Sequence, residues 1–144
     1  MNDLHNNCDA QRALGPVAMT TVAGLAGKVL DRQGFGGVEF IINYGSVTAT
    51  NATITPVVME GDATGSMTSV ADAYLLGTEA LAALPAQATA RTSGTGKFVS
   101  TRVGYVGTKR YVSCGIAALT VTAATIIAIS AVMHNPQVAP VANP

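Results

Sequence analysis

The stretch VEFIINY, residues 38–44, is the clearest structural signal in the 144-residue chain. β-Branched and aromatic side chains fill it, and Gly37 and Gly45 stand at its two ends. Such residues favour extended backbone because their side chains pack well on a pleated surface, whereas glycine interrupts a strand. The stretch therefore predicts a β-strand.

Segments of similar composition recur along the chain, separated by glycine-rich turns. Residues 53–60 (TITPVVME), 98–105 (FVSTRVGY), 109–118 and 124–133 are each predicted to form a strand. Pro56 indicates a sheet edge or a bulge, because proline donates no hydrogen bond to a neighbouring strand. This spacing predicts an all-β fold, a single antiparallel β-sandwich of jelly-roll-like type.

The other segments give weaker signals. Residues 70–84 carry most of the local helix propensity and fit either a short helix or a loop, so at most one short helix is expected. Residues 17–29 fit a strand pair or a poor helix, and their glycines count against the helix. Residues 61–66 are predicted to turn, and residues 88–97 to form a loop.

Three parts of the chain are expected. Residues 1–16 are predicted to form an N-terminal arm that ends at Gly15-Pro16, and residues 17–133 the β-sandwich domain. Residues 134–144 (HNPQVAPVANP) are predicted to form an extended, proline-rich C-terminal arm.

The composition points to a folded protein with few charges. Eight basic and eight acidic residues give a net charge of zero, and charged residues make up 11% of the chain. A hydrophobic content of 49% can build a core, which argues against disorder. The neutral balance argues against a dedicated nucleic-acid-binding protein. A poorly charged surface suits a protein that ends up against other protein.

The zero net charge conceals an asymmetry along the chain. The first 79 residues hold all eight acidic residues and three basic ones, and residues 80–144 hold five basic residues and no acid. Two interpretations are open. Either folding mixes the two signs within one chain, or the acidic half of one subunit lies beside the basic half of the next in a head-to-tail oligomer.

Cys8 and Cys114 are too few for a disulfide scaffold, and no secretory signal follows Met1. Free thiols in a reducing compartment are therefore expected. The 20 residues 114–133 are mostly apolar and long enough to span a bilayer. Their threonines and β-branched residues favour two buried strands instead, so no membrane partner is expected.

Residues suited to catalysis are scarce. His5 and His134, the two histidines, lie near the chain ends. His5, Cys8 and Asp9 are close in sequence, but a zinc site needs a fourth ligand and a rigid frame, so this segment is interpreted as a polar arm. No catalytic residue, metal or cofactor is expected.

The segment RTSGTGKF, residues 91–98, is similar to a phosphate-binding loop but fails at two positions. Arg91 occupies the place of the first glycine, and Phe98 the place of the hydroxyl residue that would reach magnesium. We therefore interpret it as an ordinary loop.

A basic stretch at residues 100–112 interleaves three cations with two tyrosines. Nucleic-acid-binding sheets combine these residue types, so Tyr105, Tyr111 and the basic residues around them are candidates for a single-stranded nucleic-acid site. The favoured interpretation is a hairpin with its tyrosines in the core or at its rim and its basic residues in solvent. A protein partner that forms salt bridges is a further alternative.

One run of residues is distinctive. Gly104–Tyr111 (GYVGTKRY) follows a predicted strand, and an apolar hairpin and His134-Asn135-Pro136 come after it. This succession resembles the capsid decoration, or cement, proteins of tailed bacteriophages. The strands VEFIINYG and TITPVVMEGDA and the N-terminal arm agree with it.

The resemblance implies a virion structural protein, not an enzyme. Such a protein is made in the bacterial cytoplasm, binds the outer capsid surface and bridges neighbouring subunits of the major capsid protein, as a dimer or trimer. A head–tail connector or tail component is the alternative. The candidate interface residues lie in the two arms and the basic hairpin: they are Leu4, Arg12, Leu14, Arg102, Lys109, Arg110, Pro136, Val138 and Val141.

Overall fold

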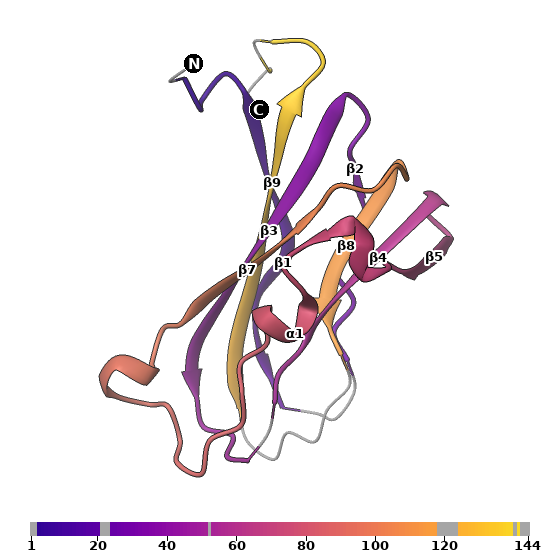
Figure 1. The fold of residues 1–144 in the computed structure, drawn as a ribbon. Coiled ribbons are helices and arrows are strands. Elements are labelled where there is room, and N and C mark those ends of the chain that lie inside the picture. The colour runs from indigo at the N-terminus through magenta and orange to yellow at the C-terminus, as the bar shows by residue number, and fades with distance from the viewer. Residues whose placement is uncertain (1–2, 21–23, 52, 118–123, 140, 142–144) are drawn as a thin grey trace.

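A computed structural model of the chain describes residues 3–20, 24–51, 53–117, 124–139 and 141. The strands are β1 (Cys8–Met19), β2 (Leu30–Asp31), β3 (Phe35–Val47), β4 (Pro56–Ala63), β5 (Ser66–Ser69), β6 (Leu75–Leu76), β7 (Ser100–Tyr105), β8 (Tyr111–Ile116) and β9 (Thr125–Pro136). One antiparallel sheet has the order β1-β9-β3-β7-β6, and the other the order β2-β8-β4-β5 (Figure 1). The expected all-β sandwich is confirmed.

The stretch VEFIINY lies inside β3, the central strand of the five-stranded sheet, which pairs with β9 on one side and β7 on the other. Side chains alternate along it as a strand requires: Val38, Phe40 and Ile42 are fully buried, whereas Ile41 faces outward and is half-buried. The inward face of this strand is the centre of the core.

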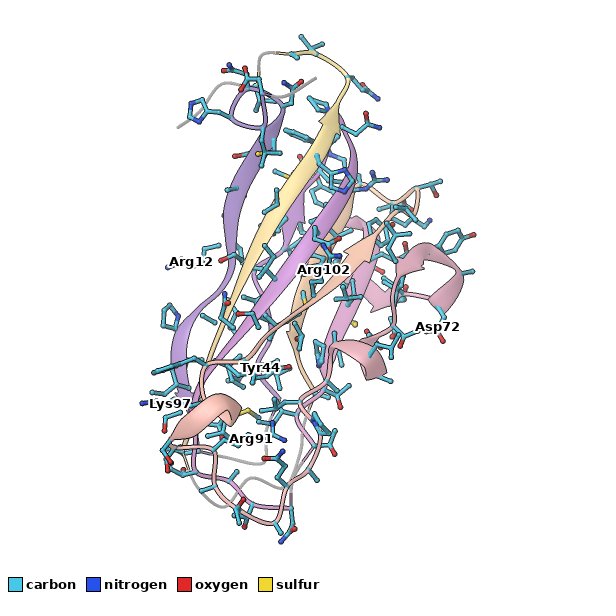
Figure 2. All side chains as sticks on the ribbon, turned by 60° about the vertical axis from the view of Figure 1, so that its left-hand side comes forward. Arg12, Tyr44, Asp72, Arg91, Lys97 and Arg102 are labelled. Carbon is cyan, nitrogen blue, oxygen red and sulfur yellow. The ribbon has the colours of Figure 1, made fainter. Side chains whose placement is uncertain are left out.

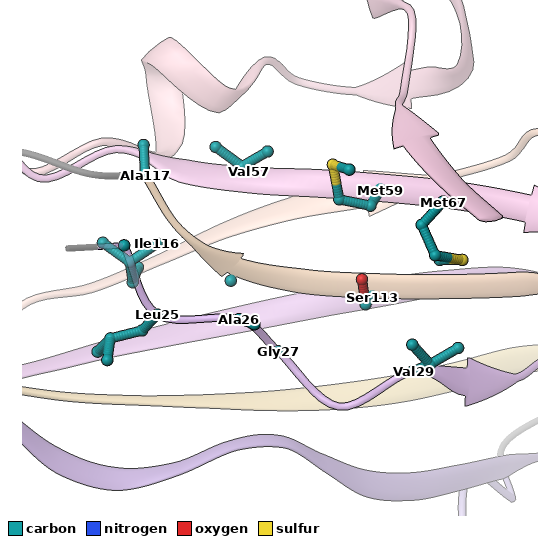
Figure 3. Close-up of a pocket in the computed structure, with 12 residues that line it drawn as sticks. Leu25, Ala26, Gly27, Val29, Val57, Met59, Met67, Ser113, Ile116 and Ala117 are labelled. Atoms are coloured by element: carbon teal, nitrogen blue, oxygen red, sulfur yellow. The ribbon is translucent and has the colours of Figure 1, made fainter. Parts of the chain in front are cut away.

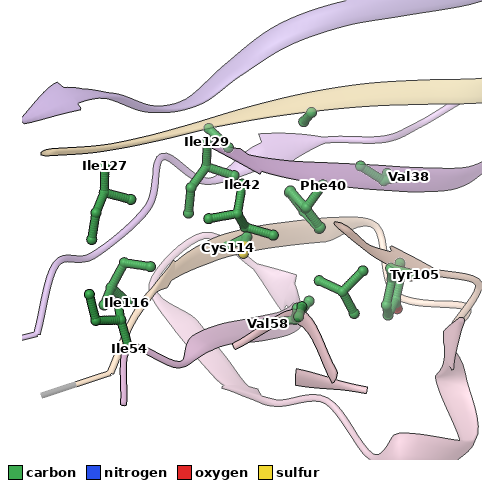
Figure 4. Close-up of a cluster of buried hydrophobic side chains, with 14 of the residues drawn as sticks. Val38, Phe40, Ile42, Ile54, Val58, Tyr105, Cys114, Ile116, Ile127 and Ile129 are labelled. Carbon is green, nitrogen blue, oxygen red and sulfur yellow. The ribbon is translucent and has the colours of Figure 1, made fainter. Parts of the chain in front are cut away.

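The core fills the space between the two sheets (Figure 4). β7 and β9 of the five-stranded sheet and β4 and β8 of the other send alternate apolar side chains into it. These are Val58, Val103, Tyr105, Val112, Cys114, Ile116, Ile127, Ile129, Ala131 and Met133.

The helical segments are short. A 3₁₀ turn, η1, spans Asp72–Tyr74, the helix α1 spans Glu79–Ala82, and a second 3₁₀ turn, η2, spans Gly94–Gly96. The hydroxyl of Thr78 accepts a hydrogen bond from the Leu81 N–H and so caps α1. At most one short α-helix was expected, and the described residues contain one. None of the helical segments in this part of the chain is long and apolar enough to cross a membrane.

The N-terminal boundary predicted at residue 16 is wrong. Residues Cys8–Met19 form β1, an edge strand paired with β9 along its whole length. Gly15-Pro16 does not end an arm but lies where the register of β1 shifts, between Leu14 and Val17. An edge strand tolerates this because the proline, which lacks an N–H, removes no bond from the centre of a sheet. Only residues before Cys8 precede the sheet.

The C-terminal boundary at residue 134 is also shifted. His134 and Pro136 continue β9 and pair with Gly37 and Phe35 of β3. Beyond the strand, the Val141 N–H donates to the Asn6 carbonyl at 2.9 Å, so Val141 lies beside the segment that precedes β1 (Figure 1). Residue 141 therefore does not belong to an arm that extends away from the domain.

In the described part of the chain, β8 pairs with neither β7 nor β9, so neither predicted hairpin near the C-terminus is formed there. β7 and β9 belong to the five-stranded sheet, whereas β8 lies between them in the chain but in the opposite sheet. The chain therefore crosses the sandwich twice, between β7 and β8 and again between β8 and β9. The expectation of buried strands instead of a membrane helix is confirmed for the described parts of residues 114–133.

The segment before β2 lies against the edge of β8. Leu25 exchanges backbone hydrogen bonds with Ile116, at 2.9 and 2.8 Å. Two glycines permit this approach: a Cβ atom on Gly27 would lie 1.9 Å from the Cys114 carbonyl oxygen, and one on Gly115 would lie 2.3 Å from the Leu25 carbonyl oxygen. Neither the strand pair nor the helix considered for residues 17–29 describes this irregular edge.

The alternation in β3 gives a direct test of the core. Replacing Ile42 with alanine removes a fully buried side chain and should lower the free energy of unfolding by about 2–5 kcal/mol. The same change at Ile41, one residue away on the outer face, should cost much less. Urea unfolding of the two variants measures the difference, and equal losses would contradict the assigned faces.

Candidate interaction surfaces

Arg32 is a buried cation held by backbone carbonyls. Its side chain is 9% exposed. Nε donates to the Lys109 carbonyl at 2.6 Å, Nη1 to the Phe35 carbonyl at 3.0 Å, and Nη2 to the Gly107 carbonyl. A buried charge is tolerated only when it is well hydrogen-bonded, and these carbonyls provide that solvation.

Tyr105 completes the same cluster. The Arg32 guanidinium lies over its ring, 5.3 Å from the centroid. The Tyr105 hydroxyl donates to the Glu60 carboxylate at 2.5 Å and accepts the Lys109 N–H at 3.1 Å. Burial, together with the hydrogen bond to Glu60, raises the pKa of Tyr105 to about 12.

The distinctive run Gly104–Tyr111 therefore forms a corner where the chain passes from one sheet to the other. We call Arg32, Glu60, Tyr105, Gly107 and Lys109 the corner cluster. Its hydrogen bonds connect β4, the segment after β2, the end of β7 and the turn that leads to β8. Within this run, Tyr105, Gly107 and the backbone of Lys109 hold the fold together and do not present a surface.

The two oppositely charged halves of the sequence pair with each other inside one chain. Arg102 lies 3.6 Å from Glu39. Lys109 and Arg110 each lie within hydrogen-bond distance of an acid of the first half, 2.5 Å from Asp62 and 2.6 Å from Asp31. The Arg110 guanidinium holds the pKa of Asp31 below its usual value. Mixing of the signs within one chain is therefore confirmed for these pairs.

The outer face of the five-stranded sheet brings two candidate interface residues together. Arg12 pairs with Ser130, Ser130 with Ile41, and Ile41 with Arg102, so the four side chains form one row across the sheet. Figure 2 labels the two arginines on this face. The Arg102 side chain is 80% exposed. With Glu39, it borders a hollow of about 410 Å³ that Leu76 and Gly77 also line.

The outer face of the four-stranded sheet carries an apolar groove of about 440 Å³ (Figure 3). Val57 and Met59 of β4 line one wall, and Met67 of β5 extends it. Leu25 and Val29, from the segment beside β8, line the opposite wall. Methionine side chains adapt to different apolar partners, so this groove is suited to bind an apolar group.

The candidate residues near the chain ends are dispersed. Leu4 and Val138 are 70% and 79% exposed. Leu14, Pro136 and Val141 are half-buried, and Leu14 packs against the core. Leu14 thus contributes to the fold, whereas the side chains of Leu4 and Val138 are exposed to solvent.

The described residues contain no cluster of titratable side chains that indicates a metal site. Among residues 3–20, 24–51, 53–117, 124–139 and 141, no group of three or more His, Cys, Asp or Glu side chains could hold a metal ion. Cys8 is half-buried, Cys114 is buried, and both are free thiols. Burial raises the pKa of Cys114 and so disfavours its reactive thiolate.

No model of a known protein family matches the chain, and no curated protein matches it significantly.

Two features were missed by sequence reasoning. The apolar groove had a signal: Val57, Val58 and Met59 are three consecutive apolar residues, which indicates a strand with apolar contacts on both faces. The role of Arg32 at the corner had no such signal, because the carbonyls that it binds there, those of Gly107 and Lys109, lie 75 and 77 residues away along the chain.

Substituting Arg32 tests the corner cluster. Arg32→Met should lower the free energy of unfolding by about 2–4 kcal/mol, because it leaves several buried carbonyls without a donor. Arg102→Met, which breaks one exposed ion pair, should cost less than about 1 kcal/mol. Denaturant unfolding provides the measurement, and an Arg32 variant as stable as the Arg102 control would refute the structural role.

The tyrosines predict how stability depends on alkaline pH. Burial raises the pKa values of Tyr44 and Tyr105 to about 12 from a usual value of 10.0. Above pH 10 the unfolded chain ionises while the folded chain does not, so stability present below pH 10 should be lost as the pH rises toward 12. Tyr105→Phe should flatten this loss. An unchanged pH profile in the variant would contradict the assignment.

Proposed function

We propose that the chain is a structural protein of a tailed-phage virion that binds the outer capsid surface and cements neighbouring subunits of the major capsid protein. The observation that carries the proposal is how the sandwich distributes its polar groups. Arg32, Arg102, Lys109 and Arg110 are each bonded within the chain, and the groove along Met59 is left apolar. This distribution of polar and apolar groups is suited to binding another protein more than to catalysis.

The resemblance over residues 104–136 supports the proposal through the fold. The corner run and β9 are the parts of the chain that the resemblance covers best, and both belong to the frame of the sandwich. A resemblance in the strands and corner that build the sandwich favours a fold shared with the cement proteins. The cementing role is inferred from that shared fold.

In this proposal, the protein stabilises the capsid through many weak contacts that are repeated over the whole shell. Burial of apolar surface contributes about 25 cal/mol per Å² removed from water, so one small contact is weak. A protein that touches two adjacent capsid subunits binds the second at high effective concentration, and many copies then stabilise the closed shell by mass action. A dimer or trimer of the chain would raise this avidity further.

A single-stranded nucleic-acid site is less well supported. Tyr105 is fully buried, so its ring cannot stack on a base. The Tyr111 ring lies under the Arg110 guanidinium, 5.1 Å from the centroid, and Arg110 is paired with Asp31. The residues proposed for that site are occupied by contacts within the chain.

Heads assembled without this chain provide the test. They should lose their DNA at a lower temperature than complete heads, because the bridges between subunits are missing. Adding the purified protein back should restore the higher temperature. A fluorescent dye that binds released DNA measures this temperature as the heads are heated. Heads that are equally robust with and without the chain would overturn the cementing role.

Copy number separates this role from that of a connector. A cement protein should be present in numbers comparable to the capsid subunits, whereas a head–tail connector or tail component is limited to one ring or one tail. Quantitative mass spectrometry of purified particles distinguishes them. A copy number on the scale of one ring would favour the connector.

A further inference from the structure

Phe98 has a backbone conformation that its side chain disfavours. Its φ angle is 59°, in the left-handed region, where a Cβ atom crowds the backbone. Among the described residues, the other non-glycine positions with positive φ are Asn51 and Asn135, a residue type that tolerates this region. A bulky aromatic residue there is an outlier that calls for an explanation.

The fold does not explain it, because the Phe98 side chain is 70% exposed. The other two phenylalanines of the chain behave differently: Phe40 is fully buried, and Phe35 packs against the core. Phe98 therefore contributes little apolar burial to the folded state while its backbone is strained.

The neighbouring residues hold Phe98 in this conformation. On one side, Val99 packs against the core, and its carbonyl accepts the Tyr44 N–H at 2.8 Å. On the other side, the Lys97 N–H donates to the Gly94 carbonyl at 3.3 Å, which closes η2. The aromatic side chain is thus presented to solvent by residues that are fixed on both sides of it.

Arg91 anchors the rest of this loop, residues 85–99. Its side chain is 6% exposed, donates to Gln87 Oε1 at 2.8 Å and also to the Pro85 carbonyl. Its backbone exchanges hydrogen bonds with Val47 at the end of β3, at 2.7 and 3.2 Å. Figure 2 labels Arg91 and Lys97 in this region, at the end of the sandwich opposite the start of β1.

The charge around Phe98 is positive. The Lys97 ammonium lies 4.3 Å from the centroid of the Phe98 ring. Of the five basic residues in positions 80–144, three are ion-paired with acids and Arg91 is buried, whereas Lys97 has no carboxylate within ion-pair distance among the described residues. Residues 85–99 contain no acid.

We infer that Phe98 is the apolar anchor of a protein-binding site, with Lys97 as its charged neighbour. The partner it fits is a protein surface with an apolar pocket bordered by carboxylates. Rigid aromatic residues presented before binding are typical centres of protein interfaces, because little conformational entropy is lost when they dock. This inference rests on the proposed function, because the proposed function identifies the protein with the pocket as the major capsid protein.

Binding of purified protein to heads assembled without it tests the inference. Phe98→Gly should weaken binding about tenfold or more, because it removes the aromatic anchor. The same variant should raise the melting temperature of the free protein, since glycine adopts a positive φ without strain. Lys97→Glu should also weaken binding, with a loss that shrinks as salt is added.

Leu81→Ala is the matched control, because Leu81 is an exposed apolar side chain, at 78%, that lies in α1 outside the loop. It should bind within about twofold of the wild-type protein. Phe98→Gly that binds as tightly as wild type would overturn the inference and leave the proposed function standing. A wild-type protein that does not bind heads would overturn the proposed function. It would also overturn the assignment of the Phe98 pocket to the major capsid protein.

Discussion

One buried guanidinium holds the corner where the chain passes from one sheet to the other. β7 and β8 lie in opposite sheets, so the backbone between Tyr105 and Tyr111 must cross the top of the core with its carbonyls and N–H groups away from any sheet. Arg32 bonds the carbonyls of Gly107 and Lys109, and its own N–H donates to the Arg110 carbonyl at 3.0 Å. Buried backbone polar groups must find partners, and here one side chain from the facing segment supplies them.

That constraint accounts for the distribution of charge. The chain is neutral and sparsely charged. Its acidic residues Asp31 and Asp62 in the first half pair with the basic residues Arg110 and Lys109 in the second half, because β8 lies between β2 and β4 in one sheet. What faces solvent is then a sheet face that carries Arg12 and Arg102 on one side and an apolar groove on the other. At the end opposite the corner, a loop pinned by Arg91 presents Phe98.

Sequence reasoning was reliable where the signal is local. The composition of VEFIINY and TITPVVME predicted β3 and β4 because side-chain shape acts within the strand itself. It was unreliable where the outcome depends on distant partners. Gly15-Pro16 suggested the end of an arm, yet β9 extends past it and converts residues 8–19 into an edge strand. Two successive strands suggested a hairpin, yet pairing across the sandwich is decided by the whole core. The run GTKRY suggested a surface, and Arg32, 75 residues from Gly107, makes part of it a corner.

Hydrogen–deuterium exchange of the protein, free and bound to heads, tests most directly the claim that one end holds the fold and the other makes the contact. The amides of Val106 and Lys109 donate to the Tyr74 carbonyl and the Tyr105 hydroxyl, so they should be protected already in the free protein and unchanged on binding. Residues 94–99 should gain protection when the protein binds. The opposite result, a corner that exchanges rapidly in the free protein and is protected only on the head, would contradict the account.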